Sequence, residues 1–131
     1  RGMYQLVLKY DGAKFDHAHR NQFLLALQAE GVEMDGPFYV AQHKSEHFNA
    51  KTSDWPMLKE RYGKGIQDPA NSLSFPVTDH AAMEESCWLH YSYLQADRSV
   101  QQDILDAIEK IRENAGELHR VELPEADKRL G

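Results

Sequence analysis

Two histidines four residues apart are the strongest candidates for chemistry in this sequence. His43 and His47 lie within FYVAQHKSEHF, residues 38–48. On a helix this spacing would place both imidazoles on one face, as metal ligands often are. A zinc protease would need His-Glu-x-x-His, which is absent, and Lys44 beside the first histidine would repel a cation. The pattern therefore favours a polar loop, and a small metal-dependent enzyme is the least favoured hypothesis.

The aromatic residues beside the histidines allow another interpretation. Tyr39 and Phe48 flank the pair. Tyr39 could offer a hydroxyl and a ring to a polyol, and His43 a donor or an acceptor near neutral pH. Binding groups often concentrate on loops held by a rigid scaffold. A metal site, a substrate-facing loop and a polar surface turn all remain open at this point.

Other residues with reactive side chains form no recognisable motif. The sequence contains no glycine-rich phosphate loop and no Gly-x-Ser-x-Gly turn. Cys87, the only cysteine, lies beside Trp88 in an apolar run, which predicts a small buried hydrophobic residue. One cysteine allows no intrachain disulfide, so we expect a reducing compartment, the cytoplasm.

Composition narrows the class of protein. The 131 residues include 41% hydrophobic and 27% charged residues, as expected for one soluble domain. A formal net charge of -6 argues against a nucleic-acid partner, which would need clustered Lys and Arg. No stretch has the roughly 20 apolar residues of a membrane span, and no signal peptide is evident. We expect Arg1 and Gly2 to be an artificial addition before a natural start at Met3.

Hydrophobic periodicity predicts one α/β domain of the α+β kind, a small sheet of about three strands with helices packed on it. The order is β-α-β-loop-α-β-α. The expected strands are 3–10, 32–34 and 87–94, and the expected helices are 16–30, 76–86 and 99–115. The irregular segment 41–75 is predicted to contain one helical turn in DWPMLKERYG, because Pro56 fits a first turn and Gly63 a helix end.

The last helix is the clearest element. Ser99 and Gln102 fit a capping box. One apolar stripe is predicted to face the sheet, and it comprises Val100, Ile104, Ala107, Ile108, Ile111 and Ala115. The expected domain is 3–118, and the polar residues 119–131 are expected to form a frayed tail.

Segments near both ends resemble one known family. HRNQFLLALQAEGVEMDGPFY resembles the helix and turn that open the C-terminal small domain of DegT/DnrJ/StrS-type sugar and cyclitol aminotransferases. The family pattern R-x-x-F-x-x-A-L-x-x-E-G-I is matched by Arg20, Phe23, Ala26, Leu27, Glu30, Gly31 and Val32. The segment from FPVTDH to ENAGEL resembles the closing helix, strand and final helix of the same domain.

The resemblance implies a pyridoxal-phosphate (PLP) enzyme that moves an amino group from glutamate or glutamine to a keto-sugar or keto-cyclitol. In that family the large domain carries the Schiff-base lysine and the phosphate site, and nothing in this sequence resembles that domain. The family pattern Tyr-Pro-x-x-His is half kept, because Tyr39 and His43 have the spacing but Val40 replaces proline. The resemblance thus implies a partial substrate-facing loop comprising Tyr39, His43, His47 and Phe48, with no catalytic residue and no cofactor-binding residue.

Two hypotheses about function follow. In the first, the chain is the separated small domain of such an aminotransferase, inactive alone and without PLP unless a large domain joins it. In the second, it is a free-standing module that binds a protein or a small polyol or sugar. Exposed apolar surface would then favour a homodimer.

Overall fold

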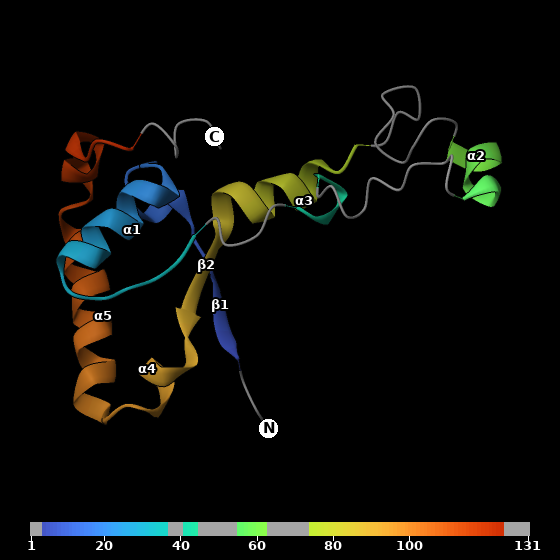
Figure 1. Cartoon of the computed structure of the whole chain (residues 1–131). Helices are drawn as coiled ribbons and strands as arrows, with labels where there is room; N and C mark the ends of the chain where they lie inside the picture. The colour runs from blue at the N-terminus through green and yellow to red at the C-terminus, as the bar shows by residue number, and fades with distance from the viewer. Residues whose placement is uncertain (1–3, 37–40, 45–54, 63–73, 125–131) are drawn as a thin grey trace. The chain divides into compact units, whose positions relative to one another are not determined.

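The computed structural model describes residues 4–36, 41–44, 55–62 and 74–124. The chain divides into two compact units, the core unit (residues 1–38 and 83–131) and the inserted unit (residues 39–82). The described elements of the core unit include strands β1 (Gln5–Lys9) and β2 (Ser86–His90) and helices α1 (Arg20–Ala29), α4 (Tyr91–Gln95) and α5 (Arg98–Glu113) (Figure 1). Those of the inserted unit include η2 (Gln42–Lys44), α2 (Pro56–Tyr62) and α3 (Pro76–His80).

The sheet is smaller than the sequence predicts, although the α+β class is confirmed. β1 and β2 pair antiparallel, with Leu8 opposite Cys87. The segment expected as the middle strand, 32–34, forms none, because its backbone is held elsewhere: Val32 N–H donates to the Leu27 carbonyl and Glu33 N–H to the Tyr93 hydroxyl. Only Asp35 reaches the sheet, through an isolated bridge to Trp88.

The expected strand 87–94 ends early, at His90. The reason is local, since the His90 side chain accepts a hydrogen bond from Ser92 N–H and so caps a helix that begins at Tyr91. A side chain on the last strand residue thus starts α4 directly, without a connecting loop.

Helix α1 begins later than expected, at Arg20. Asp16 and His17 have positive φ angles of 53° and 58°, which are incompatible with a helix start there. His19 forms the cap instead: its Nδ1 accepts from Asn21 N–H at 3.1 Å, and its own N–H donates to Gln22 Oε1 at 3.0 Å. The predicted stop at Gly31 is confirmed, since Gly31 has a φ of +90°, which favours glycine.

Helix α5 confirms the predicted stripe only in its inner part. Ile104, Ala107 and Ile111 are buried, Ile108 and Ala115 are partly buried, and Val100 is 37% exposed. The predicted capping box of Ser99 and Gln102 is wrong, because the cap residue is Asp97, two residues before Ser99, and the helix begins at Arg98. The Gln102 amide donates to Asp106 instead, at 2.8 Å.

One apolar core lies in the core unit, between the strands and helices α1 and α5. Its buried members are Tyr10, Phe15, Ala18, Phe23, Leu24, Leu27, Val32, Met34, Cys87, Leu89, Ile104, Ala107, Ile111 and Leu118. Leu118 lies in a short 3-10 turn, η6 (Ala115–Arg120), which extends two residues into the segment expected as a tail. Burying this many large apolar side chains is the main term that stabilises the unit.

A buried arginine ties α1 to β2. Arg20 is only 2% exposed, and its guanidinium donates to the Ser86 carbonyl at 3.1 Å and to Asn21 Oδ1 at 3.2 Å. Gly36 passes so close that a Cβ there would lie 2.5 Å from Leu24 Cδ1 and 2.9 Å from Arg20 Nε. The arginine therefore links helix α1 to strand β2, and a side chain at position 36 would require Leu24 or Arg20 to move.

The inserted unit confirms two short helical predictions. Helix α2 begins at Pro56 and covers the predicted helical turn, and Pro76 begins α3. A π-turn, Ala81–Glu85, then leads the chain into β2, so the expected helix 76–86 is irregular in its second half.

Candidate functional site

His43 is held by a carboxylate in the inserted unit. Its Nε2 lies 3.0 Å from Asp79 Oδ1, and Lys44 Nζ lies 3.1 Å from the same oxygen. The imidazole also lies against Phe75, with ring centroids 4.8 Å apart. Two short elements, η2 and α3, thus bring a histidine, a lysine and an aspartate together.

This cluster can orient an imidazole. An ionised carboxylate offers only acceptor atoms, so the contact of 3.0 Å with Asp79 Oδ1 favours the tautomer with a proton on His43 Nε2. The His43 side chain is 21% exposed, and the aromatic contact restricts how the ring turns. Such an oriented imidazole suits a hydrogen bond to a hydroxyl or a carbonyl group of a ligand.

The structure places only part of the predicted substrate-facing loop. Tyr39, His47 and Phe48 lie outside the described residues, and His43 is the one predicted site residue whose surroundings are defined. Asp79 and Phe75 were missed from the sequence. The segment FPVTDH predicts only the start of a helix. Asp79 lies one helical turn after Phe75, and this spacing was the signal that a carboxylate lies near the Phe75 ring.

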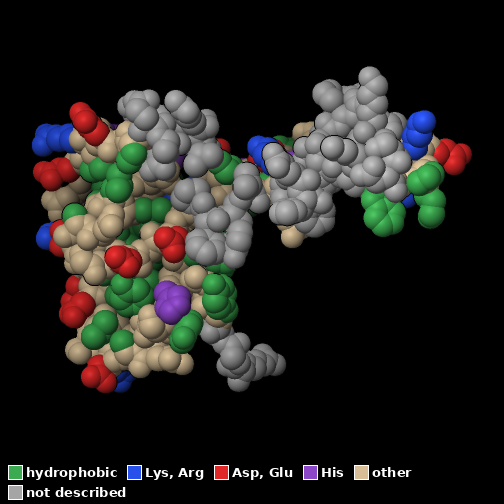
Figure 2. Space-filling view, viewed as in Figure 1, with side chains coloured by type: hydrophobic (Ala, Val, Ile, Leu, Met, Phe, Trp, Pro, Cys, Tyr) green, Lys and Arg blue, Asp and Glu red, His purple; other side chains and the backbone are tan. Residues whose placement is uncertain are grey.

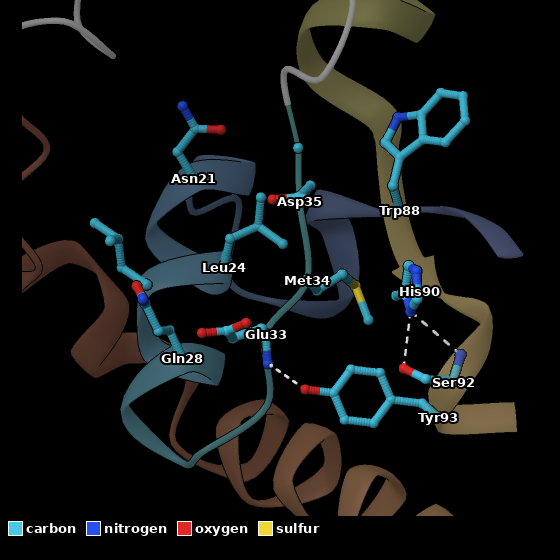
Figure 3. A pocket seen from close by; sticks show the side chains of 12 residues that line it. Asn21, Leu24, Gln28, Glu33, Met34, Asp35, Trp88, His90, Ser92 and Tyr93 are labelled. Atoms are coloured by element: carbon cyan, nitrogen blue, oxygen red, sulfur yellow. Dashed lines mark hydrogen bonds between the residues drawn. The ribbon is translucent and has the colours of Figure 1, made fainter. Parts of the chain in front are cut away.

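A pocket of about 600 Å³ lies in the core unit, between α1, segment 33–36 and the turn from β2 into α4 (Figure 3). Leu24, Met34, Trp88 and Tyr93 supply apolar wall. The polar lining comprises Asn21, Gln28, Glu33, Asp35, His90 and Ser92. This is the mixed lining of small-molecule sites, and some of its polar groups also serve the fold.

Hydrogen bonds within the pocket show this structural use. The Tyr93 hydroxyl accepts from Glu33 N–H at 3.2 Å, and His90 Nδ1 lies 2.8 Å from Ser92 Oγ. Asp35 exchanges two backbone hydrogen bonds with Trp88, at 3.0 and 2.7 Å. The pocket is therefore a candidate binding surface, in which Asn21, His90, Ser92 and Tyr93 make hydrogen bonds inside the protein.

The described residues do not fit a site for a Schiff-base cofactor. Such a site needs a lysine that can react as a neutral amine. Lys9, Lys44 and Lys110 are each held in an ion pair, with Glu85, Asp79 and Glu30. Lys14 and Lys59, the other described lysines, are exposed and lie outside the pocket given above.

Metal and membrane sites are also not found where side chains are described. Within residues 4–36, 41–44, 55–62 and 74–124, no three or more His, Cys, Asp or Glu side chains gather as metal ligands would. No helix in those ranges is long and apolar enough to cross a membrane. Figure 2 shows carboxylates spread over the visible face of the core unit rather than gathered in one patch.

Burial raises the pKa of two groups in the core, the Cys87 thiol and the Tyr10 hydroxyl. Loss of water raises the pKa of Cys87 from 9.0 to about 11, an effect that the nearby Arg20 charge partly opposes. Burial also raises the pKa of Tyr10 to about 12, with further contributions from Cys87 and Asp11. Cys87 is only 2% exposed, which confirms the small buried hydrophobic residue that the sequence predicts, and the raised pKa keeps its thiol neutral near pH 7.

Three curated proteins match almost the whole chain. Each is provisionally named L-glutamine:3-amino-2,3-dideoxy-scyllo-inosose aminotransferase. The protein from Streptomyces kanamyceticus is 42% identical over 120 residues, 91% of this chain, and that from Micromonospora echinospora is 40% identical over 121 residues, 92% of this chain. The protein from Streptoalloteichus tenebrarius is 36% identical over 121 residues. No family model matches the chain, and no solved structure matches it.

The match covers only a small part of each relative. The chain spans 28% of the length of each of the three. That share is consistent with a small domain that lacks the large domain of the same enzymes. The predicted resemblance is confirmed to this extent: the chain is homologous to a segment of cyclitol-type aminotransferases, just over a quarter of their length.

Proposed function

We propose that this chain is the C-terminal small domain of a PLP-dependent aminotransferase of the DegT/DnrJ/StrS type that acts on an amino- or keto-cyclitol. The observation that carries the proposal is 36–42% identity spread over nine-tenths of the chain. The amino donor would be glutamine, as in the printed names of the relatives. The hypothesis of a free-standing module gains no support from these comparisons.

By itself the domain is not catalytic in this proposal. In the proposal the Schiff-base lysine and the contacts to PLP belong to the rest of the enzyme, and Lys9, Lys44 and Lys110 of this domain serve in ion pairs. When bound there, PLP supplies the electron sink for transfer of the amino group. Partners of the domain are then the large domain and, in a homodimeric enzyme, a second subunit. The single buried cysteine fits a cytoplasmic enzyme.

The loop that begins at Tyr39 is the proposed contribution to the substrate site. Tyr39, His43, His47 and Phe48 would face the cyclitol, with Asp79 orienting His43. The support is the contact of 3.0 Å between His43 Nε2 and Asp79 Oδ1 and the packing of the ring on Phe75. A polyol offers several hydroxyl groups that an oriented imidazole can recognise.

A chimeric enzyme tests the proposal. In the Streptomyces kanamyceticus relative, the matched segment is replaced by residues 3–124 of this chain, and transfer of the amino group from glutamine to a keto-cyclitol is measured. We expect an active chimera that shows PLP absorbance, and we expect no activity from this chain alone. The relative with the segment deleted is the control for background activity. A chimera that folds and binds PLP but transfers no amino group would contradict the proposal.

A further inference from the structure

The pocket beside α1 contains two carboxylates that the fold does not use. Glu33 and Asp35 both line this pocket of about 600 Å³, and both are exposed. Each residue serves the fold through its backbone: Glu33 N–H donates to the Tyr93 hydroxyl, and Asp35 exchanges two backbone hydrogen bonds with Trp88. Within the described part of the chain, neither carboxylate has a hydrogen-bond or ion-pair partner.

No cation neutralises these carboxylates within the lining. The described residues that line the pocket include no lysine and no arginine. His90 adds no positive charge, because its Nδ1 accepts a hydrogen bond from Ser92 N–H and so carries no proton. Arg20 lies next to Gly36, but it is only 2% exposed, donates to Asn21 Oδ1 and does not belong to the lining. The pocket therefore presents a negative charge to a ligand.

The same pocket also offers neutral hydrogen-bond donors. Asn21 is only 4% exposed, and its Oδ1 accepts from Arg20 Nε at 3.2 Å, which assigns the other amide atom as the NH₂ group. No described residue accepts a hydrogen bond from that amide nitrogen. The Tyr93 hydroxyl accepts from Glu33 N–H and can still donate its own proton. Such donors suit the hydroxyl oxygens of a ligand.

Figure 3 shows how these groups are arranged. Glu33 lies beside Gln28 of α1, whereas His90 and Ser92 lie on the other side of Met34. Polar groups thus stand on both sides of an apolar middle. The volume of about 600 Å³ falls within the range of about 300–1,000 Å³ that is usual for small-molecule sites. A single ring with polar groups around its edge matches this arrangement.

We propose that this pocket binds a small hydroxylated primary amine. Its ammonium group would contact the Glu33 and Asp35 carboxylates, and its hydroxyl groups would meet the Asn21 amide and the Tyr93 hydroxyl. An ammonium group has three donors and no acceptor, so it complements carboxylates whose acceptor atoms are unused. A ligand that carries a carboxylate or a phosphate would instead be repelled. The inference rests on this pocket and does not require that the chain belongs to an aminotransferase.

Three ring-shaped probes separate recognition of the charge from recognition of the hydroxyl groups. scyllo-Inosamine carries an ammonium group and hydroxyl groups, scyllo-inositol carries hydroxyl groups only, and cyclohexylamine carries an ammonium group only. Each is titrated into the full chain, and binding is followed by backbone amide NMR shifts. We expect scyllo-inosamine to bind about fivefold more tightly than scyllo-inositol, the scale of one exposed charge pair, and more tightly than cyclohexylamine. The largest shifts should occur at Glu33, Asp35 and Ser92.

A matched pair of variants tests the carboxylate. Glu33→Gln and Glu113→Gln each neutralise an exposed glutamate, and Glu113 lies on α5 outside the pocket lining. Glu33→Gln should keep the fold, because the N–H of residue 33 still donates to Tyr93. It should weaken binding of scyllo-inosamine about three- to fivefold and leave binding of scyllo-inositol unchanged, whereas Glu113→Gln should change neither.

Salt gives a readout that needs no variant. Raising NaCl from about 0.05 M to about 0.5 M should weaken binding of scyllo-inosamine to the unmodified chain but not binding of scyllo-inositol, since salt screens charge pairs.

The contrary outcomes are distinct. Equal affinities for scyllo-inosamine and scyllo-inositol would overturn recognition of the amine, and so would binding that is insensitive to salt. Equal affinities for scyllo-inosamine and cyclohexylamine would overturn recognition of the hydroxyl groups. Shifts centred outside the pocket, or no saturable shift with any probe, would overturn the site. The proposed function is unaffected by each of these results, because activity of the chimera tests it separately.

Discussion

The core unit and the described part of the inserted unit differ in how far they bury their apolar side chains. The core unit buries fourteen apolar side chains in one cluster and fixes Arg20 within it. The described part of the inserted unit has short helices, and Trp55, Met57 and Val77 are 62%, 88% and 81% exposed. The difference predicts that stability depends mainly on the first unit, whereas the second holds His43, the described residue proposed to face the cyclitol.

The largest contrast should come from truncating one apolar side chain in each unit. Leu27 is fully buried, so Leu27→Ala should lower the free energy of unfolding by about 2–5 kcal/mol. Met57→Ala removes a mostly exposed side chain and should change it by less than about 0.5 kcal/mol. Urea unfolding followed by circular dichroism measures both. Equal losses in the two variants would show that the units do not differ in this way.

A glycine in the core unit should respond next most strongly. In Gly36→Ala the new methyl group would lie 2.5 Å from Leu24 and 2.9 Å from Arg20, so buried groups must move. We expect a loss of about 1–3 kcal/mol by overpacking. Gly12→Ala is the control, since its nearest neighbour would be 3.7 Å away, and it should cost less than Gly36→Ala in the same unfolding measurement. A Gly36→Ala protein as stable as the wild type would mean that the arginine contact is loose.

High pH should weaken the core unit. The pKa values of Cys87 and Tyr10 are raised to about 11 and about 12, so the folded state favours the neutral forms. This contribution to stability is complete below the unfolded pKa values of 9.0 and 10.0, and it is lost as pH rises through the folded values. Thermal midpoints should therefore fall between about pH 9 and pH 12.

A cysteine variant sharpens this pH experiment. In Cys87→Ala the decline should begin later, near the ordinary Tyr10 pKa of 10.0, because the thiol no longer titrates. An unchanged onset in this variant would show that Cys87 contributes nothing to the pH dependence.

The smallest effect on stability is expected in the inserted unit. Asp79→Asn removes a partly exposed pair with His43 and Lys44, which should cost less than about 1 kcal/mol. The effect should instead appear in the ¹⁵N chemical shifts of the His43 ring. A carboxylate at position 79 can only accept a hydrogen bond from Nε2, whereas the amide of the variant can either donate or accept one. Glu109→Gln, which breaks an exposed pair with Arg112, is the control and should leave those shifts unchanged.

The sequence predicts those parts of the fold in which one periodicity dominates. The alternation of Leu6 and Leu8 predicted β1, and the spacing of Ile104, Ala107 and Ile111 predicted α5. Gly31 predicted the end of α1.

The errors arise where side chains compete for backbone groups. His19 and His90 each cap a helix, and a histidine cap is not expected from usual preferences. The missing middle strand depends on the contact between Glu33 and Tyr93, which are distant in sequence.

The candidate site was harder to predict, for a similar reason. His43 was singled out by its type and spacing, but its partner Asp79 belongs to another element, and no local pattern links the two. The resemblance to an aminotransferase, in contrast, depended on ordered motifs and is supported by the relatives.

One measurement tests most directly whether the inserted unit serves the reaction while the core unit maintains the fold. In the active chimera, His43→Ala is compared with the parent for kcat/KM with the keto-cyclitol and for the thermal midpoint. We predict a fall in kcat/KM of about tenfold or more, as for loss of one useful hydrogen bond to a substrate, with a midpoint that hardly changes. A variant with full kcat/KM and a clearly lowered midpoint would contradict the account, because His43 would then be a structural residue.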